Sequence, residues 1–313
     1  MPPPWPGNGR CLWEMATCEG EWARARALLH GIGCWPWILN QFYSDEQLRT
    51  VFERIRSWKL RFALEVPALK ASGWGYDGKS LDAAGAFEQH RMFERRFVKA
   101  GMPRVDAFAM DEPLYAARHA GASTEAAPDA RLRHGVAQTA EFIALIRRAY
   151  PRARVGDIEP YPALTFSEIT GCVEALQAAC RQRRAAGPDF LRLDVDWSLF
   201  SDRRDTGWHE VKRIEDFCRA RRIGFSLIYW AADQPRLAAA GKGDEMTWRG
   251  GVLAMARAYH DAGGRPDQVV LESWLHTPQH AVPDTDPTTF TASLRDLCAE
   301  LKIGAGRRAG GTL

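Results

Sequence analysis

Strand-like and helix-like segments alternate along the whole chain. Short apolar, β-type runs occupy residues 11–16, 33–42, 61–67, 106–111, 154–159, 190–196, 224–230 and 268–274. Amphipathic helical patterns follow them at residues 19–30, 45–58, 82–100, 134–150, 167–184, 208–221, 247–262 and 288–302. Strands that alternate with helices pair in parallel through crossover connections, and eight such units close a barrel. We therefore expect an α/β fold, a single-domain (β/α)8 TIM barrel over residues 1–303, with a disordered tail at 304–313.

The composition argues against several classes of protein. The chain has 313 residues, of which 46% are hydrophobic, and its net charge is only +3, so a large core fits and no strong electrostatic partner is implied. Arginine-rich runs lie in helical segments, where they are typical of solvated faces rather than of a nucleic-acid groove. No long apolar run suggests a membrane span. We expect a monomer without a cofactor, located in the cytoplasm because no export signal is visible. An upstream export segment would instead place it in the periplasm or outside the cell.

Acidic residues gather at the carboxyl ends of the expected strands, which form the functional face of this fold. They are Glu65, Asp111, Glu112, Asp157, Glu159, Asp194, Asp196 and Glu272. Residues two apart on a strand share a face. Ile158, Leu193 and Val195 are apolar and suit the face that meets the helices, so we expect the acids to face the barrel axis. Arg192 shares that face and is expected to neutralise one of the deeper carboxylates.

Aromatic residues accompany the acids. Tyr161, Trp197, Tyr229, Trp230 and Trp274 each lie at or just beyond a strand end. Flat apolar rings beside carboxylates suit sugars, which offer C–H faces for stacking and hydroxyl groups for hydrogen bonds. We therefore predict a carbohydrate substrate in a cleft at this end of the barrel. The predicted substrate-binding residues are Glu65, Asp111, Asp157, Tyr161, Asp194, Asp196, Trp197, Tyr229, Trp230 and Trp274.

Two strand ends resemble those of the barrel glycoside hydrolases of the retaining group called clan A. Asp111-Glu112-Pro113 is similar to the Asn-Glu-Pro that ends their fourth strand, where the glutamate is the general acid/base. Ser273-Trp274 is similar in position to the substrate-stacking tryptophan at the end of their eighth strand. Their nucleophile ends strand seven, whereas this chain has Tyr229-Trp230 there. The motifs MDEP, GDIEPYP, LDVDW and ESW also resemble a set of uncharacterised bacterial barrel proteins with the look of glycosidases.

The resemblance implies a glycoside hydrolase that cleaves a glycosidic bond, with Glu112 as the proton donor. Its second carboxylate would be Glu272, across the barrel, or Glu159, on the neighbouring strand. Retaining enzymes hold the two carboxyl groups about 5–5.5 Å apart and inverting enzymes about 6.5–9.5 Å apart. The sequence leaves the stereochemistry open.

Two other classes fit the same residues. A metal-dependent sugar isomerase, epimerase or lyase could bind Mg²⁺ or Mn²⁺ through carboxylate oxygens, although no histidine lies at a strand end. The oxygen ligands would come from Glu65, Glu112, Asp157, Glu159, Asp196 and Glu272. A non-catalytic barrel could bind a glycan without cutting it, because the strand-seven acid is missing.

Overall fold

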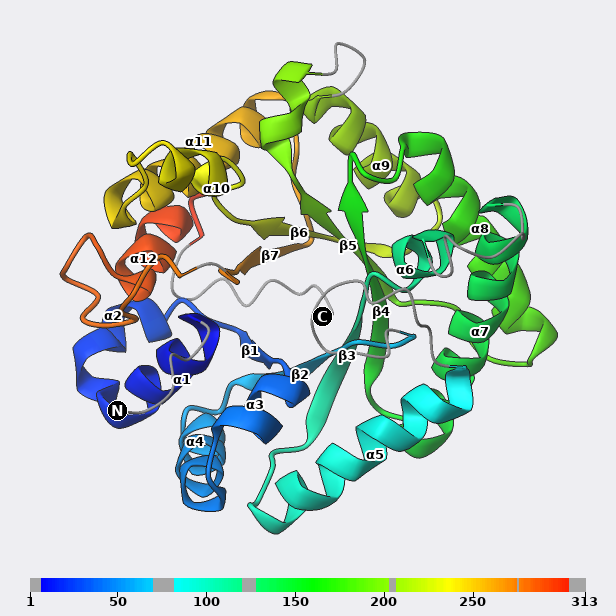
Figure 1. Ribbon diagram of the computed structural model, residues 1–313, viewed down its shortest axis with the longest axis horizontal. Coiled ribbons are helices and arrows are strands. Elements are labelled where there is room, and N and C mark those ends of the chain that lie inside the picture. The colour runs from blue at the N-terminus through cyan, green and yellow to red at the C-terminus, as the bar shows by residue number, and fades with distance from the viewer. Residues whose placement is uncertain (1–6, 70–81, 120–127, 203–206, 275, 304–313) are drawn as a thin grey trace.

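The structure is a computed structural model that describes residues 7–69, 82–119, 128–202, 207–274 and 276–303. Seven parallel strands form one sheet in the order of the chain. They are β1 (Gly31–Cys34), β2 (Arg61–Val66), β3 (Val105–Asp111), β4 (Arg154–Tyr161), β5 (Phe190–Val195), β6 (Gly224–Tyr229) and β7 (Gln268–Leu271). The sheet curls into an incomplete barrel, and within the described ranges no ladder joins β7 to β1 (Figure 1). The predicted barrel fold is confirmed, with seven strands rather than eight in the described part of the chain.

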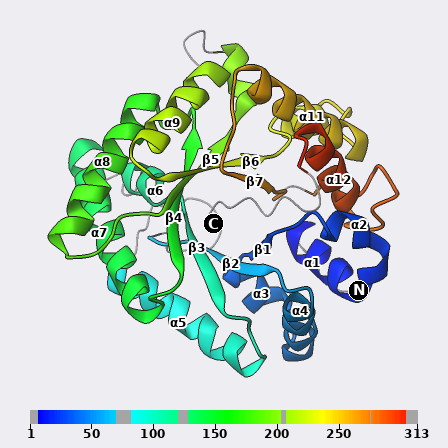
Figure 2. The ribbon, with the colours of Figure 1, turned by 180° about the vertical axis from the view of Figure 1, so that it is seen from behind.

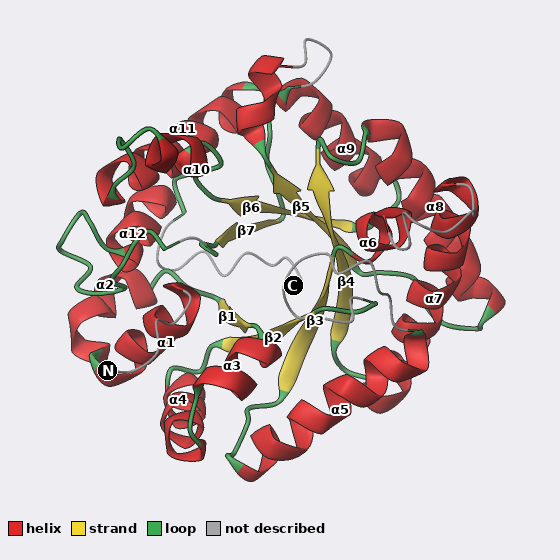
Figure 3. Ribbon diagram, in the orientation of Figure 1, coloured by secondary structure: helices red, strands yellow, loops and turns green. Residues whose placement is uncertain are grey.

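Twelve α-helices accompany these strands in the described part of the chain. They are α1 (Gly7–Thr17), α2 (Ala23–Arg26), α3 (Pro36–Phe42), α4 (Asp45–Ser57), α5 (Ala83–Lys99), α6 (Pro113–His119), α7 (Pro128–Ala149), α8 (Phe166–Gln182), α9 (Trp208–Ala220), α10 (Gln234–Ala239), α11 (Glu245–Asp261) and α12 (Phe290–Glu300). Figure 2 shows them from behind as a ring outside the strands, and Figure 3 separates the two kinds of element by colour. The helices therefore cover the outer face of the sheet.

The first expected strand, residues 11–16, is a helix. It belongs to α1, and its buried residues Leu12, Met15 and Ala16 recur at the spacing of a helix face. A short apolar run fits the periodicity of a helix as well as that of a strand, which explains the wrong prediction. The second expected strand, 33–42, is half right: β1 ends at Cys34, and Pro36 begins α3, where its missing N–H is not needed.

Apolar layers hold the helices against the outer face of the sheet. One layer joins β2, β3 and β4 to α4, α5 and α7, and another joins β5 and β6 to α8, α9 and α11. A smaller cluster inside the barrel includes Ile158, Phe190 and Ile228. A Cβ atom at Gly156 would lie 2.0 Å from the Phe190 ring, so glycine lets this ring cross the interior.

Candidate functional site

Arg192 establishes which side chains point into the barrel. On β5, Arg192 and Asp194 are two residues apart and share a face. Arg192 Nη1 lies 3.9 Å from Glu65 Oε2, and Glu65 is on β2, three strands away in the sheet. Its Nε also donates to Ser226 Oγ at 3.2 Å and its Nη2 to Gln268 Oε1 at 3.1 Å. These contacts cross the interior, so the prediction that Arg192 neutralises a deep carboxylate is confirmed.

Six carboxylates surround this end of the barrel, and we call them the inner acids. They are Glu65, Asp111, Glu112, Asp194, Asp196 and Glu272. Burial raises the pKa of Asp194 well above its usual range, and the negative charges of the neighbouring acids raise it further, with Glu112 first among them. Burial likewise raises the pKa of Glu272, and the charges of Glu65 and Asp194 add to this, whereas Arg192 opposes it. Four of the other inner acids thus act electrostatically on Asp194, and three act on Glu272.

Two polar atoms on the inner face lack partners. Among the residues that the structure describes, Asp194 Oδ1 and Trp230 Nε1 are buried and form no hydrogen bond. The Trp230 side chain belongs to the interior cluster and its residue is 7% exposed. Leaving a buried polar group unpaired costs about 1–3 kcal/mol. Such groups are rare in native proteins, and an acceptor and a donor left together on one face call for a functional explanation.

Tryptophans line the inner acids. The rings of Trp230 and Trp274 lie 4.1 Å apart between centroids, at an interplanar angle of 46°. Trp197 Nε1 donates to the Trp230 carbonyl oxygen at 3.1 Å. Trp35 Nε1 donates to Glu65 Oε1 at 2.5 Å. Trp35 was not predicted at the site because the second expected strand ran through it; its position directly after β1 was the available signal.

Glu112 adopts an uncommon backbone conformation. Its φ is +50°, in the left-handed region that side chains with a Cβ atom rarely adopt. Its N–H donates to the Ile158 carbonyl at 2.9 Å, and its own carbonyl accepts from the Ala116 N–H at 2.9 Å. The residue thus forms the turn from β3 into α6, with Pro113 at the first helical position. Strain of this kind persists only where the surroundings enforce it, and it is common at functional strand ends.

The expectation that Asp157 and Glu159 face the axis is wrong. Glu159 accepts hydrogen bonds from the Leu114 N–H at 2.8 Å and the Tyr115 N–H at 3.0 Å, so it caps the start of α6 on the outer face. Asp157 shares that face, is fully buried and has two unpartnered oxygens among the described residues. Ile158, which was assigned to the helices, belongs to the interior cluster instead. Backbone N–H groups thus hold Glu159 on the outer face, although the charge of Glu112 helps to raise its pKa.

Tyr161 and Tyr229 also lie outside the site. Both are in the apolar layer between the sheet and α8, α9 and α11. The Tyr161 hydroxyl donates to Glu210 Oε2 of α9. Burial raises the pKa of the Tyr229 hydroxyl well above its usual range. Both tyrosines help to build the outer layer, and the prediction that they bind substrate is wrong.

Asp196 has a structural partner as well as its place among the inner acids. Its Oδ1 accepts from the Ser198 N–H at 3.2 Å and from Ser198 Oγ at 2.5 Å. These bonds stabilise the start of the short 3₁₀-helix at Trp197–Asp202. Asp196 therefore shapes the loop after β5 and adds negative charge beside Asp194.

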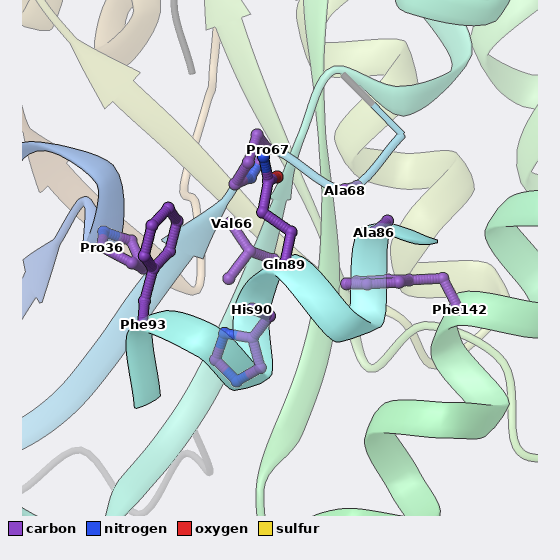
Figure 4. Close-up of a pocket in the computed structure, with 9 residues that line it drawn as sticks. All are labelled: Pro36, Val66, Pro67, Ala68, Ala86, Gln89, His90, Phe93 and Phe142. Carbon is purple, nitrogen blue, oxygen red and sulfur yellow. The ribbon is translucent and has the colours of Figure 1, made fainter. Parts of the chain in front are cut away.

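A small cavity lies on the other side of the sheet. It is lined by Pro36, Val66, Pro67, Ala68, Ala86, Gln89, His90, Phe93 and Phe142 (Figure 4). Val66 packs in the outer layer, so the sheet separates this cavity from the inner acids. In the described ranges no three Asp, Glu, His or Cys side chains are placed to hold a metal ion. None of the described helices combines the length and the apolar character needed to cross a bilayer.

Comparisons with known proteins give likenesses in structure but none in sequence. No family model matches the chain, and no curated protein matches its sequence. Among solved structures, the chain is similar to a crystal structure of D-psicose 3-epimerase in the presence of D-fructose. The two share 13% sequence identity over 94% of this chain and 95% of that chain, with a TM-score of 0.46. This likeness concerns the fold.

The prediction of a glycoside hydrolase is wrong. Within the chain, one of the two predicted partners of Glu112, Glu159, is buried on the outer face as a helix cap. The strand that would carry the clan A nucleophile, β6, ends at Tyr229 and is followed by Trp230, so it has no acid at its end. The resemblance to clan A is thus limited to the position of a few residues.

Proposed function

We propose that the protein is an enzyme that moves a proton at a carbon atom of an uncharged sugar, as an isomerase, an epimerase or a lyase does. The observation that carries the proposal is the pair Asp194 and Glu272. Asp194 is on the inner face of β5, and Glu272 directly follows β7. Burial raises the pKa of both carboxyl groups, and the charge of Asp194 also raises that of Glu272.

Such a pair can supply an acid and a base together. The charge of Asp194 favours the protonated form of Glu272, so Glu272 can keep a proton while a neighbouring carboxyl group ionises. The ionised group can remove a proton from the carbon next to a carbonyl, and the protonated group can give its proton to the carbonyl oxygen. Reversal of these two transfers at the neighbouring carbon, or on the opposite face of the same carbon, completes an isomerisation or an epimerisation.

The charge of the site supports an uncharged substrate. Six carboxylates gather there, and Arg192, which contacts them in the described part of the chain, already pairs with Glu65. A phosphorylated sugar or a sugar acid would meet repulsion in this low-dielectric setting. Hydroxyl groups can bind carboxylates, and the rings of Trp230 and Trp274 offer apolar faces for sugar C–H groups.

Solvent exchange tests this proposal whichever product the reaction forms. The protein is incubated in D₂O with free aldoses and ketoses, among them D-fructose and D-glucose, and with their phosphorylated forms. Proton NMR should show loss of a carbon-bound hydrogen signal for a free sugar and none for the phosphorylated forms. A parallel series with a chelator, and with Mg²⁺ or Mn²⁺ restored, measures whether a metal ion takes part. Sugar binding without exchange would support a non-catalytic barrel and overturn the proposal.

A further inference from the structure

The two unpartnered atoms of the inner face belong to β5 and to the residue that directly follows the neighbouring strand β6. Asp194 on β5 pairs in register with Ile228 on β6, and Trp230 comes two residues later on the same face. From the strand spacing and rise, the Cα atoms of Asp194 and Trp230 are roughly 8 Å apart. The two side chains can therefore reach one small group that lies between them.

The chemistry of the two atoms defines that group. Trp230 Nε1 can only donate a hydrogen bond, and the carboxylate oxygen Oδ1 of Asp194 can accept one. A hydroxyl group accepts and donates through a single oxygen atom, so it satisfies both. An apolar group would satisfy neither, and an anionic oxygen could accept from Trp230 but would face the negative inner acids.

The nearby indole groups show why Trp230 is distinctive. Trp197 Nε1 and Trp35 Nε1 already have acceptors, in the Trp230 carbonyl and in Glu65. Trp230 Nε1 has none among the described residues, although the side chain is almost fully buried. Its unsatisfied N–H is thus not a general property of tryptophans at this end of the barrel.

We infer that one hydroxyl group of the sugar binds between Trp230 Nε1 and Asp194 Oδ1, and that this contact selects the substrate. The inference rests on the substrate class proposed above, an uncharged sugar. A site that uses buried polar groups to bind a hydroxyl rejects the analogue that lacks it, by up to about 10⁴–10⁵-fold in kcat/KM. The sugar lacking this hydroxyl should therefore be discriminated against far more strongly than sugars lacking any other.

Binding measurements test the inference independently of turnover. D-fructose, D-glucose and the set of their monodeoxy analogues are titrated into the wild-type protein and the Trp230→Phe variant, with affinities from calorimetry or ligand-observed NMR. In the wild type, one analogue should bind at least about 100-fold more weakly than its parent. Trp230→Phe keeps a ring but lacks the N–H. In this variant the ratio of the two affinities should fall below about tenfold, because only the parent sugar loses affinity.

Trp248→Phe is the matched control. Trp248 Nε1 is another buried, unpartnered indole nitrogen of the described residues, but it lies in the outer layer on α11. Its replacement should leave the ratio between parent and analogue unchanged. Equal ratios in wild type and Trp230→Phe would overturn the inference, and so would failure of both free sugars to bind. If the sugar still exchanges deuterium but the affinity ratios are equal in wild type and Trp230→Phe, the inference fails and the proposed function stands. If the ratio depends on Trp230 but no deuterium is exchanged, the inference stands and the proposed function fails.

Discussion

The two faces of the sheet use the same kind of residue in opposite ways. On the inner face, Asp194 and Glu272 lie among other acids, and Glu272 is also near the buried Arg192. On the outer face, Glu159 accepts two backbone N–H groups at the start of α6. Buried carboxylates are therefore not markers of a site by themselves. The charges of Asp157 and Glu112 also raise the pKa of Glu159, and what sets Glu159 apart is that it accepts hydrogen bonds from the end of a helix.

Asp157 is a buried carboxylate of the outer face that, in the described part of the chain, is not bound to a helix end. It lies on the outer face, is fully buried and has no hydrogen-bond partner among the described residues. Burial raises its pKa well above the usual range of an aspartate. It therefore resembles Asp194 electrostatically but lies behind the sheet, between β4 and α8. A comparison of these two aspartates separates the effect of burial from the effect of position.

The largest effect is expected from Glu272→Gln. Removal of a general acid or base lowers the rate by about 10²–10⁴-fold, and the amide retains the shape of the side chain. Deuterium exchange into the sugar measures the loss, and sugar binding should stay within about tenfold of wild type. Glu53→Gln, an exposed change on α4, is the control. Unimpaired exchange in Glu272→Gln would remove this residue from the proposed mechanism.

A pH-dependent gain in stability is expected from Asp157→Asn. The folded pKa of Asp157 is raised above the unfolded value, about 3.9. Above that pH the unfolded chain releases a proton that the folded protein keeps, so this group lowers the free energy of unfolding as pH rises. The slope is about 1.4 kcal/mol per pH unit until the folded pKa is reached. Asparagine does not titrate. Between pH 5 and pH 8 the variant should therefore have a higher free energy of unfolding than the wild type, measured by urea unfolding. A difference that does not change with pH would refute this account.

A smaller loss of stability is expected from Glu159→Gln. The amide oxygen can replace only one acceptor, and the amide nitrogen would then face the second backbone N–H of α6. The free energy of unfolding should fall by about 1–3 kcal/mol. Glu168→Gln is the matched change at a capping box, where glutamine can still accept from the Thr165 N–H. Similar losses in the two variants would mean that Glu159 is no more than an ordinary cap.

Much of the architecture could be predicted from the sequence because the elements are locally consistent. Strands β2 to β6 lie within about two residues of their expected positions, and α4 begins at the capping box formed by Ser44 and Gln47. The acids at the ends of β3, β5 and β7 were found for the same reason, since strand ends are well marked by composition.

The face of β4 could not be predicted from alternation. The alternation of side chains along a strand shows that Asp157 and Glu159 share a face. It does not show whether this is the inner or the outer face, and Ile158 is apolar enough for either. The decision depends on Phe190 of the neighbouring strand, whose ring needs the space beside Gly156. That is a tertiary contact, and Gly156 is the signal of it in the sequence of β4 itself.

The most direct test compares Asp194→Asn with Asp157→Asn. Both variants remove one ionisable oxygen from a carboxylate with a raised pKa, one on each face of the sheet. The measurement is the rate at which deuterium from D₂O enters the sugar, followed by NMR. We predict a loss of about 10²–10⁴-fold for Asp194→Asn and a rate within a few-fold of wild type for Asp157→Asn. Equal losses in both variants, or no loss in Asp194→Asn, would contradict the claim that the inner carboxylates carry the proton transfer.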